Sequence, residues 1–167
     1  HLGELGHEVI GVELSPLAAE AFFAESGLVP ERSKRGPFEV YGGHGVEILV
    51  GDVFALPEIR NELPAIGAIY DRAALVALPA EMRVRYAQLL VELLPPGGHI
   101  LLVAFDYDQS KMPGPPFAVS AEHVQDLYGT SCTIEPLGVR DVTDQRPRFR
   151  EVGAAPVLET VFLLTRR

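Results

Sequence analysis

Apolar segments of two kinds alternate along this chain, and this alternation constrains the fold more than any other feature. Short, nearly continuous apolar runs, typical of buried strands, occupy residues 8–14, 46–50, 65–71 and 99–105. The clearest helical periodicity lies between the last two of these runs, at residues 79–94. Strands that alternate with helices form βαβ units, whose parallel strands are covered on both faces. The sequence therefore predicts an α/β fold with a mainly parallel sheet.

Local signals place two further helices. Ser15 and Pro16 are typical of an N-cap and a first helical residue, and a glycine at position 27 favours a helix end, so we expect a helix over residues 15–26. The apolar residues expected on its inner face are Leu17, Ala21 and Phe22. A second, shorter helix is expected at residues 120–128, where Ser120 would cap it.

The chain ends on two apolar runs that indicate strands, at residues 133–137 and 157–164. A polar, arginine-rich loop joins them over residues 140–153. Because the two strands lie close in sequence, we expect a hairpin and an antiparallel C-terminal edge of the sheet. A short strand is also expected at residues 38–41, inside the glycine- and proline-rich segment 28–45.

The charge balance and the single cysteine exclude several classes of protein. Fourteen Lys and Arg residues against 23 Asp and Glu give a formal net charge of −9, which argues against a nucleic-acid partner. No apolar run approaches the roughly 20 residues of a membrane helix, so no membrane partner is expected. The lone Cys132 excludes an intramolecular disulfide, and the histidines show no metal-ligand spacing, so no metal site is expected. The opening residues, HLGELGH, lack the apolar stretch of a signal peptide, and we expect a cytoplasmic protein.

Acidic residues follow all four predicted parallel strands, at the edge where doubly wound sheets bind ligands. They are Glu13, Asp52, Asp71, and the pair Asp106 and Asp108. Acids before a helix also complement the helix dipole, and this alternative stays open for each residue taken singly. A carboxylate in the position of Glu13 accepts hydrogen bonds from both ribose hydroxyls, and one in the position of Asp52 accepts from an adenine amino group. The pattern predicts a nucleoside-type cofactor and does not separate NAD from S-adenosylmethionine.

The glycine-rich loop of such folds has no counterpart in this sequence. Gly3, Gly6 and Gly11 do not form a GxGxxG motif after a strand. We interpret HLGELGH as the end of the first helix, so that a first, central strand and its glycine motif are absent from the chain. Two half-sheets with unpaired edges are then expected.

Four stretches of the sequence resemble the thiopurine S-methyltransferase family, its bacterial branch more than its animal branch. They read GHEVIGVELSPLAAEAFF, GDVFALP, YDRAALVALPAEMRVRYAQLL and DYDQSKMPGPPFAVS. The resemblance implies a seven-stranded, Rossmann-like class I methyltransferase fold, in which residues 1–167 form a single domain that lacks its N-terminal part. It also implies S-adenosylmethionine as cofactor, S-adenosylhomocysteine as product, and methyl transfer to an aromatic or heterocyclic thiol.

The same resemblance implies roles for individual residues. Glu13 matches the ribose-binding acid of the family, and Asp52 and Val53 match the pair beside the adenine. Arg72, in the stretch DRAAL, matches an arginine beside cofactor and substrate.

A second arginine of the family lies in the loop before the last strand, where Arg146 and Arg148 are both candidates. Spacing from Asp141 favours Arg146, whereas spacing back from Gly153 favours Arg148, and we favour Arg148. Arginine is a permanent cation with several donors, so two such residues stabilise a thiolate. The alternative for Arg146 and Arg148 is an ordinary pair of solvated surface arginines.

Pro115, Pro116 and Phe117 form a short apolar stretch after a glycine. We expect a rigid lip over a flat substrate here, because proline fixes φ and costs little entropy to hold in place. A plain connecting loop is the alternative reading.

Several alternative functions stay open. A related methyltransferase for selenium or tellurium compounds, halide or thiocyanate differs only in its acceptor. An NAD-dependent oxidoreductase would need GxGxxG, and the stretch DRAALVALP argues against it. A non-catalytic, nucleoside-binding remnant is the alternative of another class. The partner expected for the favoured function is a small-molecule thiol, and the expected oligomeric state is a monomer.

Overall fold

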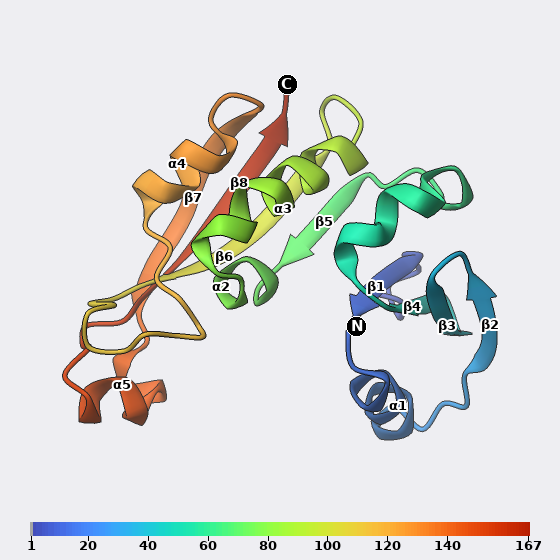
Figure 1. The fold of residues 1–167 in the computed structure, drawn as a ribbon, viewed down its shortest axis with the longest axis horizontal. Helices are drawn as coiled ribbons and strands as arrows, with labels where there is room; N and C mark the ends of the chain where they lie inside the picture. Colours follow the sequence, from blue (N-terminus) through green and yellow to red (C-terminus); the bar gives the residue numbers. More distant parts are fainter. Residues whose placement is uncertain (1) are drawn as a thin grey trace. The chain divides into compact units, whose positions relative to one another are not determined.

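The computed structural model describes residues 2–167, which are coloured along the sequence in Figure 1. The chain divides into two compact units, the first reaching Pro64 and the second spanning Ala65–Arg167. Each unit contains one four-stranded sheet. Whether residues 1–167 form a single domain, as the sequence suggested, stays a prediction. Within the described residues, no helix is both long enough and apolar enough to cross a bilayer.

The first unit builds a mixed sheet with the strand order β1-β4-β3-β2. Its elements are β1 (Val9–Glu13), α1 (Pro16–Glu25), β2 (Glu31–Arg35), β3 (Phe38–Gly43), β4 (Val46–Val50) and the 3-10 segment η1 (Val53–Glu62). β1 runs parallel to β4, whereas β3 is antiparallel to both of its neighbours. A core of five buried residues forms between α1 and this sheet: Ala19, Phe23, Tyr41, Ile48 and Val50.

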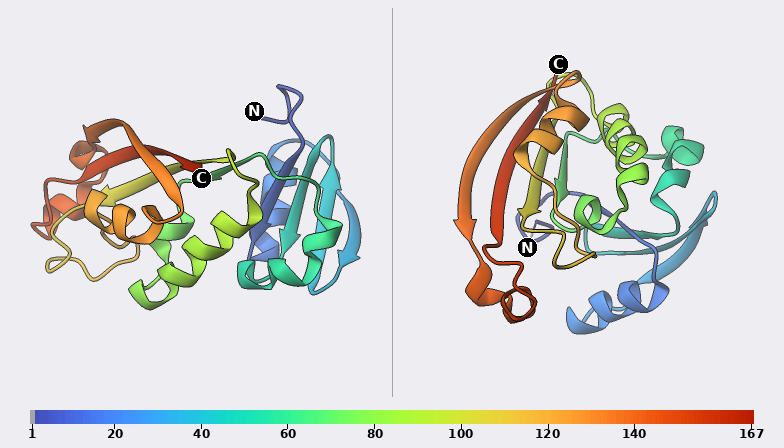
Figure 2. Two further views of the ribbon diagram at one scale, coloured as in Figure 1. Left: turned by 90° about the horizontal axis from the view of Figure 1, so that it is seen from above. Right: turned by 60° about the vertical axis from the view of Figure 1, so that its left-hand side comes forward.

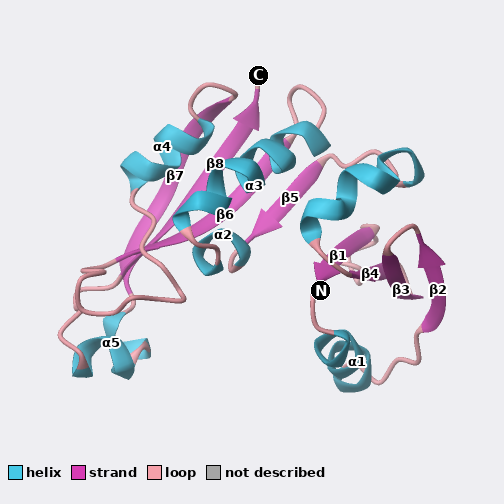
Figure 3. Ribbon diagram, in the orientation of Figure 1, coloured by secondary structure: helices cyan, strands magenta, loops and turns pink. Residues whose placement is uncertain are grey.

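The second unit builds a larger sheet with the order β5-β6-β8-β7. Its strands are β5 (Ala68–Asp71), β6 (His99–Asp106), β7 (Cys132–Asp141) and β8 (Leu158–Arg166). Its helical elements are α2 (Ala74–Ala77), α3 (Ala80–Leu93), α4 (Ala121–Tyr128), η2 (Thr143–Gln145) and α5 (Pro147–Glu151). α3 and α4 cover the same face of the sheet, and α5 lies at the far end of the β7–β8 hairpin (Figures 2 and 3).

The α/β class and several elements predicted from the sequence are confirmed. β4 occupies the predicted residues 46–50, Ser15 and Ser120 cap α1 and α4, and β7 and β8 form the expected antiparallel hairpin at an edge. The expected separation into two sheets is also observed, with β1 and β5 as terminal strands. The sheets are more mixed than predicted, since the β2–β3 hairpin and the pairing of β6 with β8 are antiparallel.

Three local predictions are wrong. The segment 140–153, predicted as a loop, contains η2 and α5. The inner face of α1 is formed by Ala19 and Phe23, whereas the three predicted residues are exposed: Leu17 (75%), Ala21 and Phe22 (42%). Nearly every position of this helix is apolar, so the sequence pattern does not single out one face. Residues 2–6 form turns rather than a helix end, closed by hydrogen bonds such as that from the Leu5 N–H to the Leu2 carbonyl (3.1 Å). His1, the first residue of that predicted helix end, lies outside the described residues.

Candidate functional site

Parallel pairing of β1 and β4 brings two of the predicted cofactor residues to one edge of the first unit. Glu13, the last residue of β1, pairs with Val50, and its carbonyl accepts a hydrogen bond of 2.9 Å from the Gly51 N–H. Asp52 follows immediately as the N-cap of η1, and Val53 is the first residue of that segment. The structure therefore places Glu13, Asp52 and Val53 at the carboxyl ends of neighbouring strands, as predicted.

Backbone N–H groups hold both carboxylates of this edge. Glu13 Oε1 accepts a hydrogen bond from the Ser15 N–H at 2.8 Å, and Asp52 Oδ1 accepts one from the Phe54 N–H at 2.9 Å. Asp52 is exposed and Glu13 is half-buried. In each carboxylate one oxygen accepts this backbone hydrogen bond, which fixes the orientation of the group, and the second oxygen can accept from a ligand. Such an arrangement suits the hydroxyl and amino donors of a nucleoside.

In the second unit, a buried carboxylate anchors the turn that presents Arg72. Asp71 ends β5 and is 3% exposed, and its Oδ1 accepts hydrogen bonds from the N–H groups of Ala74 (3.0 Å) and Leu75 (3.3 Å). Burial raises the pKa of Asp71, and the hydrogen bonds from Leu75, Tyr86 and Ala74 oppose this effect. Arg72 itself is exposed at the carboxyl end of the strand. Its backbone is thus fixed while its side chain stays accessible.

A pocket of about 280 Å³ joins the predicted lip to both candidate arginines. It is lined by Met112, Pro115, Pro116, Gln145, Arg146, Pro147, Arg148 and Phe149. We call it the Pro–Arg pocket. The lip comes from the segment after β6, and the arginines come from the segment before β8, so residues about thirty positions apart in sequence meet here. Both arginine alternatives of the sequence analysis thus lie at the same pocket.

The two arginines are held differently. The Arg146 guanidinium lies 4.3 Å from the centre of the Phe105 ring, and its side chain is half-buried. Arg148 is exposed and lies in the short helix α5. The Arg146 guanidinium therefore stacks on an aromatic ring, and the attraction between cation and ring stabilises it there. Arg148, in contrast, is accessible to solvent.

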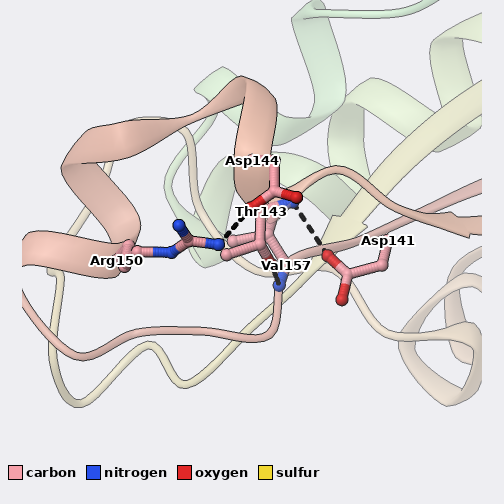
Figure 4. Close-up of polar contacts among 5 residues, drawn as sticks. All are labelled: Asp141, Thr143, Asp144, Arg150 and Val157. Carbon is pink, nitrogen blue, oxygen red and sulfur yellow. Dashed lines mark hydrogen bonds and ion pairs between the residues drawn. The ribbon is translucent and has the colours of Figure 1, made fainter.

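Polar contacts at the end of β7 fix the loop that carries these arginines. Asp141 Oδ1 accepts a hydrogen bond from the Thr143 N–H (2.8 Å), and Thr143 Oγ1 accepts one from the Val157 N–H (2.8 Å), as Figure 4 shows. Arg150 forms an ion pair with Asp144 in the same view. The hydroxyl and N–H of Thr143 lower the pKa of Asp141. The loop is thus tied back to the start of β8.

Tyr107 holds the lip and has no counterpart in the predicted site. Its single O–H donates to the Pro116 carbonyl at 2.7 Å, and the Met112 carbonyl, at 3.2 Å, is a second acceptor that shares this hydrogen. Its ring packs edge-on against Phe149 at 4.8 Å between ring centres. Burial raises the pKa of Tyr107, so the hydroxyl remains a donor. The motif YD before the lip was the only sequence signal for this residue.

Phe117 is the last residue of the lip, residues 114–117, and is not among the residues that line the Pro–Arg pocket. Its N–H donates to the Val76 carbonyl at 2.6 Å, and its ring lies against Gly114. A Cβ at Gly114, where φ is +84°, would lie 2.4 Å from Phe117 Cδ1. Phe117 therefore supports the lip, and glycine is required at its base.

Solved structures of low sequence identity show the fold of this chain. An S-adenosylmethionine-dependent methyltransferase from Methanosarcina mazei superposes with a TM-score of 0.66 at 15% identity, over 99% of this chain and 84% of its own. The [4+2]-cyclase SpnF superposes with a TM-score of 0.62 at 15% identity, over 96% of this chain and 66% of its own. At such identities the likeness shows the fold alone, which is the Rossmann-like fold of class I methyltransferases.

Sequence comparison gives the family. The thiopurine S-methyltransferase family model matches residues 1–167. A thiopurine S-methyltransferase of Nitrosospira multiformis is 45% identical over 99% of this chain and 74% of its own length. One from Xanthomonas axonopodis pv. citri is also 45% identical, over 99% and 75%. The chain belongs to the thiopurine S-methyltransferase family, and its cofactor is S-adenosylmethionine.

Proposed function

We propose that the Pro–Arg pocket binds the sulfur acceptor, and that Glu13, Asp52 and Val53 bind the nucleoside part of S-adenosylmethionine. The reaction itself follows from the family. The protein is an S-adenosylmethionine-dependent S-methyltransferase that acts on thiopurine-like, aromatic or heterocyclic thiols. The assignment of residues rests on the geometry of the two units, each taken by itself.

One observation carries the assignment of the acceptor site. The Pro–Arg pocket combines the apolar faces of Pro115 and Pro116 with the cations Arg146 and Arg148. An aromatic thiol has a flat apolar ring and an acidic sulfur. Its ring packs against apolar side chains, and its ionised sulfur is stabilised by cations. A second pocket of this unit, between α3 and α4, has no arginine or lysine in its lining and has two acids there, Glu92 and Asp126.

The chain's task in this reaction is to position and ionise the thiol. S-adenosylmethionine supplies a methyl group that is already activated by its sulfonium. Arg146 and Arg148 are permanent cations, and a cation within about 4–6 Å of an acid lowers its pKa by about 1–3 units. They therefore favour the thiolate, and the proton of the thiol goes to water. The thiolate sulfur would bond to the methyl carbon as the bond from that carbon to the sulfonium sulfur breaks, with S-adenosylhomocysteine as the leaving group. Pro115 and Pro116 orient the ring and exclude water from one side of it.

Arg72 is proposed to contact the cofactor or the acceptor. The support is its place at the carboxyl end of β5 and the fixed backbone beneath it, where Asp71 holds the following turn. Its side chain is exposed and available for a ligand.

The reaction class is tested by product release. We expect the protein, mixed with S-adenosylmethionine and 6-mercaptopurine, to release S-adenosylhomocysteine only when the thiol is present. Selenite, tellurite, iodide and thiocyanate serve as competing acceptors in the same assay. If S-adenosylhomocysteine is released faster with one of these compounds than with the thiol, that compound is the preferred acceptor. Binding of S-adenosylhomocysteine without turnover of any acceptor would favour a non-catalytic, nucleoside-binding protein.

We further propose that the protein acts as a cytoplasmic monomer on a small-molecule partner. The alternative to this proposal is a dimer, whose contact would use the exposed apolar residues Leu17 and Phe22 of α1. Light scattering after gel filtration is expected to give the mass of one chain. A mass of two chains that returns to one in a Leu17→Ser variant would contradict the proposal.

A further inference from the structure

Arg83 is a buried cation that forms no ion pair at contact distance among the described residues, although the charge of Glu81 acts on it. It projects from α3 and is only 3% exposed. Burying a charge is costly unless polar groups compensate it. Its Nε donates to the Leu78 carbonyl at 2.9 Å, and Nη1 donates to the Ala118 carbonyl at 3.2 Å. Two backbone carbonyls therefore compensate this guanidinium in place of a carboxylate.

The partners of Arg83 belong to two segments that frame the lip, residues 114–117. Leu78 is the C-cap residue that follows α2, and Ala118 follows the lip directly. The guanidinium carbon also lies 5.5 Å from the centre of the Phe117 ring, within the range of a cation–π contact. One side chain thus holds the C-terminal end of the lip through its backbone and through its aromatic residue.

A histidine completes the surroundings of Arg83. Nη1 lies 3.5 Å from Nδ1 of His123 in α4. Burial and the Arg83 charge both lower the pKa of His123, and Asp126 opposes them. A neutral imidazole accepts a hydrogen bond from the guanidinium. His123 therefore helps to compensate the buried charge of Arg83 and does not repel that charge.

Other contacts hold the lip independently of Arg83. Tyr107 bonds to the Pro116 carbonyl, and the Phe117 N–H bonds to the Val76 carbonyl. Pro115 and Pro116, held between these anchors, line the Pro–Arg pocket. Arg83 does not line that pocket, so any effect on the acceptor must pass through the lip.

We propose that Arg83 is a positioning residue that sets the place of the lip and thereby the affinity of the Pro–Arg pocket for flat aromatic thiols. This inference rests on the proposed function of that pocket. The fork of a guanidinium reaches two diverging carbonyls at once, whereas the single ammonium of a lysine does not reproduce that geometry. Arginine is therefore specified at this position for its shape as well as its charge.

The test compares Arg83→Met and Arg83→Lys with Arg85→Met, which removes the same charge from the exposed face of α3. Backbone hydrogen exchange of the peptide that contains residues 114–119 reports on the lip. Calorimetry with 6-mercaptopurine, in the presence of S-adenosylhomocysteine, reports on the pocket without requiring turnover. S-adenosylhomocysteine binding alone serves as an internal control.

In Arg83→Met we expect faster exchange of the lip and about tenfold weaker binding of the thiol, with S-adenosylhomocysteine affinity unchanged. Arg83→Lys should show the same changes to a smaller extent, and it keeps the test valid if Arg83→Met does not fold. Arg85→Met should match the wild type.

Unchanged exchange in both Arg83 variants, or faster exchange with unchanged thiol affinity, would overturn the inference. Equal loss of affinity for the thiol and for S-adenosylhomocysteine would also overturn it, because that result indicates a general structural role. A wild-type protein that binds no aromatic thiol would instead refute the proposed function itself.

Discussion

Arg146 and Arg148 line one pocket, but their different surroundings indicate different roles. Arg146 is stacked on Phe105 and half-buried, whereas Arg148 is exposed. A stacked guanidinium contributes to the packing of the loop as well as to the electrostatic potential of the pocket. An exposed one contributes its charge when a ligand arrives. Both are expected to favour the thiolate form of the acceptor.

Replacing Arg148 by alanine should therefore weaken the acceptor step without loosening the fold. We expect KM for 6-mercaptopurine to rise about tenfold, and the pH–rate profile to move to higher pH, because loss of a nearby cation raises the pKa of the bound thiol. Arg146→Ala should show the same shift and also lower the melting temperature. Arg150→Ala is the matched control, since Arg150 pairs with Asp144 and does not line the pocket. An equal kinetic loss in Arg150→Ala would contradict this assignment.

Glu13 is proposed to accept hydrogen bonds from the ribose diol of the cofactor. Glu13→Gln keeps the size of the side chain but replaces one acceptor oxygen by a donor nitrogen. We expect S-adenosylhomocysteine to bind about tenfold more weakly, as measured by calorimetry. Glu8→Gln, an exposed change just before the other end of β1, should leave affinity unaltered. Identical affinities in wild type and Glu13→Gln would remove Glu13 from the proposed cofactor site.

Among the elements, the lip depends on one backbone conformation. Gly114 has φ of +84°, and an added Cβ would lie 2.4 Å from Phe117 Cδ1. Gly114→Ala should therefore destabilise the protein by about 1–2 kcal/mol or more, and it should raise KM for the thiol. Gly138→Ala in β7 is the control, because no atom lies within 4 Å of its added Cβ. Chemical denaturation of the two variants provides the comparison, and equal midpoints would show that the lip tolerates a side chain.

The loop before β8 makes a pH-dependent contribution through Asp141. Its pKa is lowered in the folded protein by the hydroxyl and N–H of Thr143, so the carboxylate stabilises the fold above its ordinary pKa of 3.8. That contribution is lost as the pH falls through the lowered value. We expect Asp141→Asn to melt below the wild type at pH 7, with the difference shrinking in acid. A difference that persists well below pH 3.8 would show that the hydrogen bonds do not depend on the charge.

Elements with strong local signals could be predicted from the sequence, and those defined by tertiary contacts could not. The strand at residues 46–50 and the caps Ser15 and Ser120 are local features, and they were predicted with the observed bounds or positions. β2 has the sequence ERSKR and is mostly exposed, so it carries no apolar pattern. It forms because it pairs with β3. The inner face of α1 was wrong for a related reason, since an almost wholly apolar helix takes its face from the sheet beneath it.

The same distinction holds for the candidate site. The acids at the strand ends could be predicted as candidate site residues, because the direction of the parallel strands brings them to one edge. The Pro-Pro stretch could be predicted because it belongs to a sequence motif. Tyr107 and Arg83 could not, because their role depends on carbonyl groups that the fold brings to them from other segments. A buried arginine on a helix looks, in sequence, like any solvated one.

For the molecule as a whole, the family supplies the reaction and the two units supply separate parts of the chemistry. The first unit carries paired carboxylates at one sheet edge, and the second carries a pocket with an apolar wall and two cations. The central claim is that this pocket receives the sulfur acceptor. It is independent of which natural thiol the protein methylates.

A crystal structure with S-adenosylhomocysteine and 6-mercaptopurine tests that claim most directly. We expect the purine ring to lie against Pro115 and Pro116, with its sulfur beside Arg148 or Arg146. A thiol bound elsewhere, with the Pro–Arg pocket filled only by water, would show that this pocket is not the acceptor site.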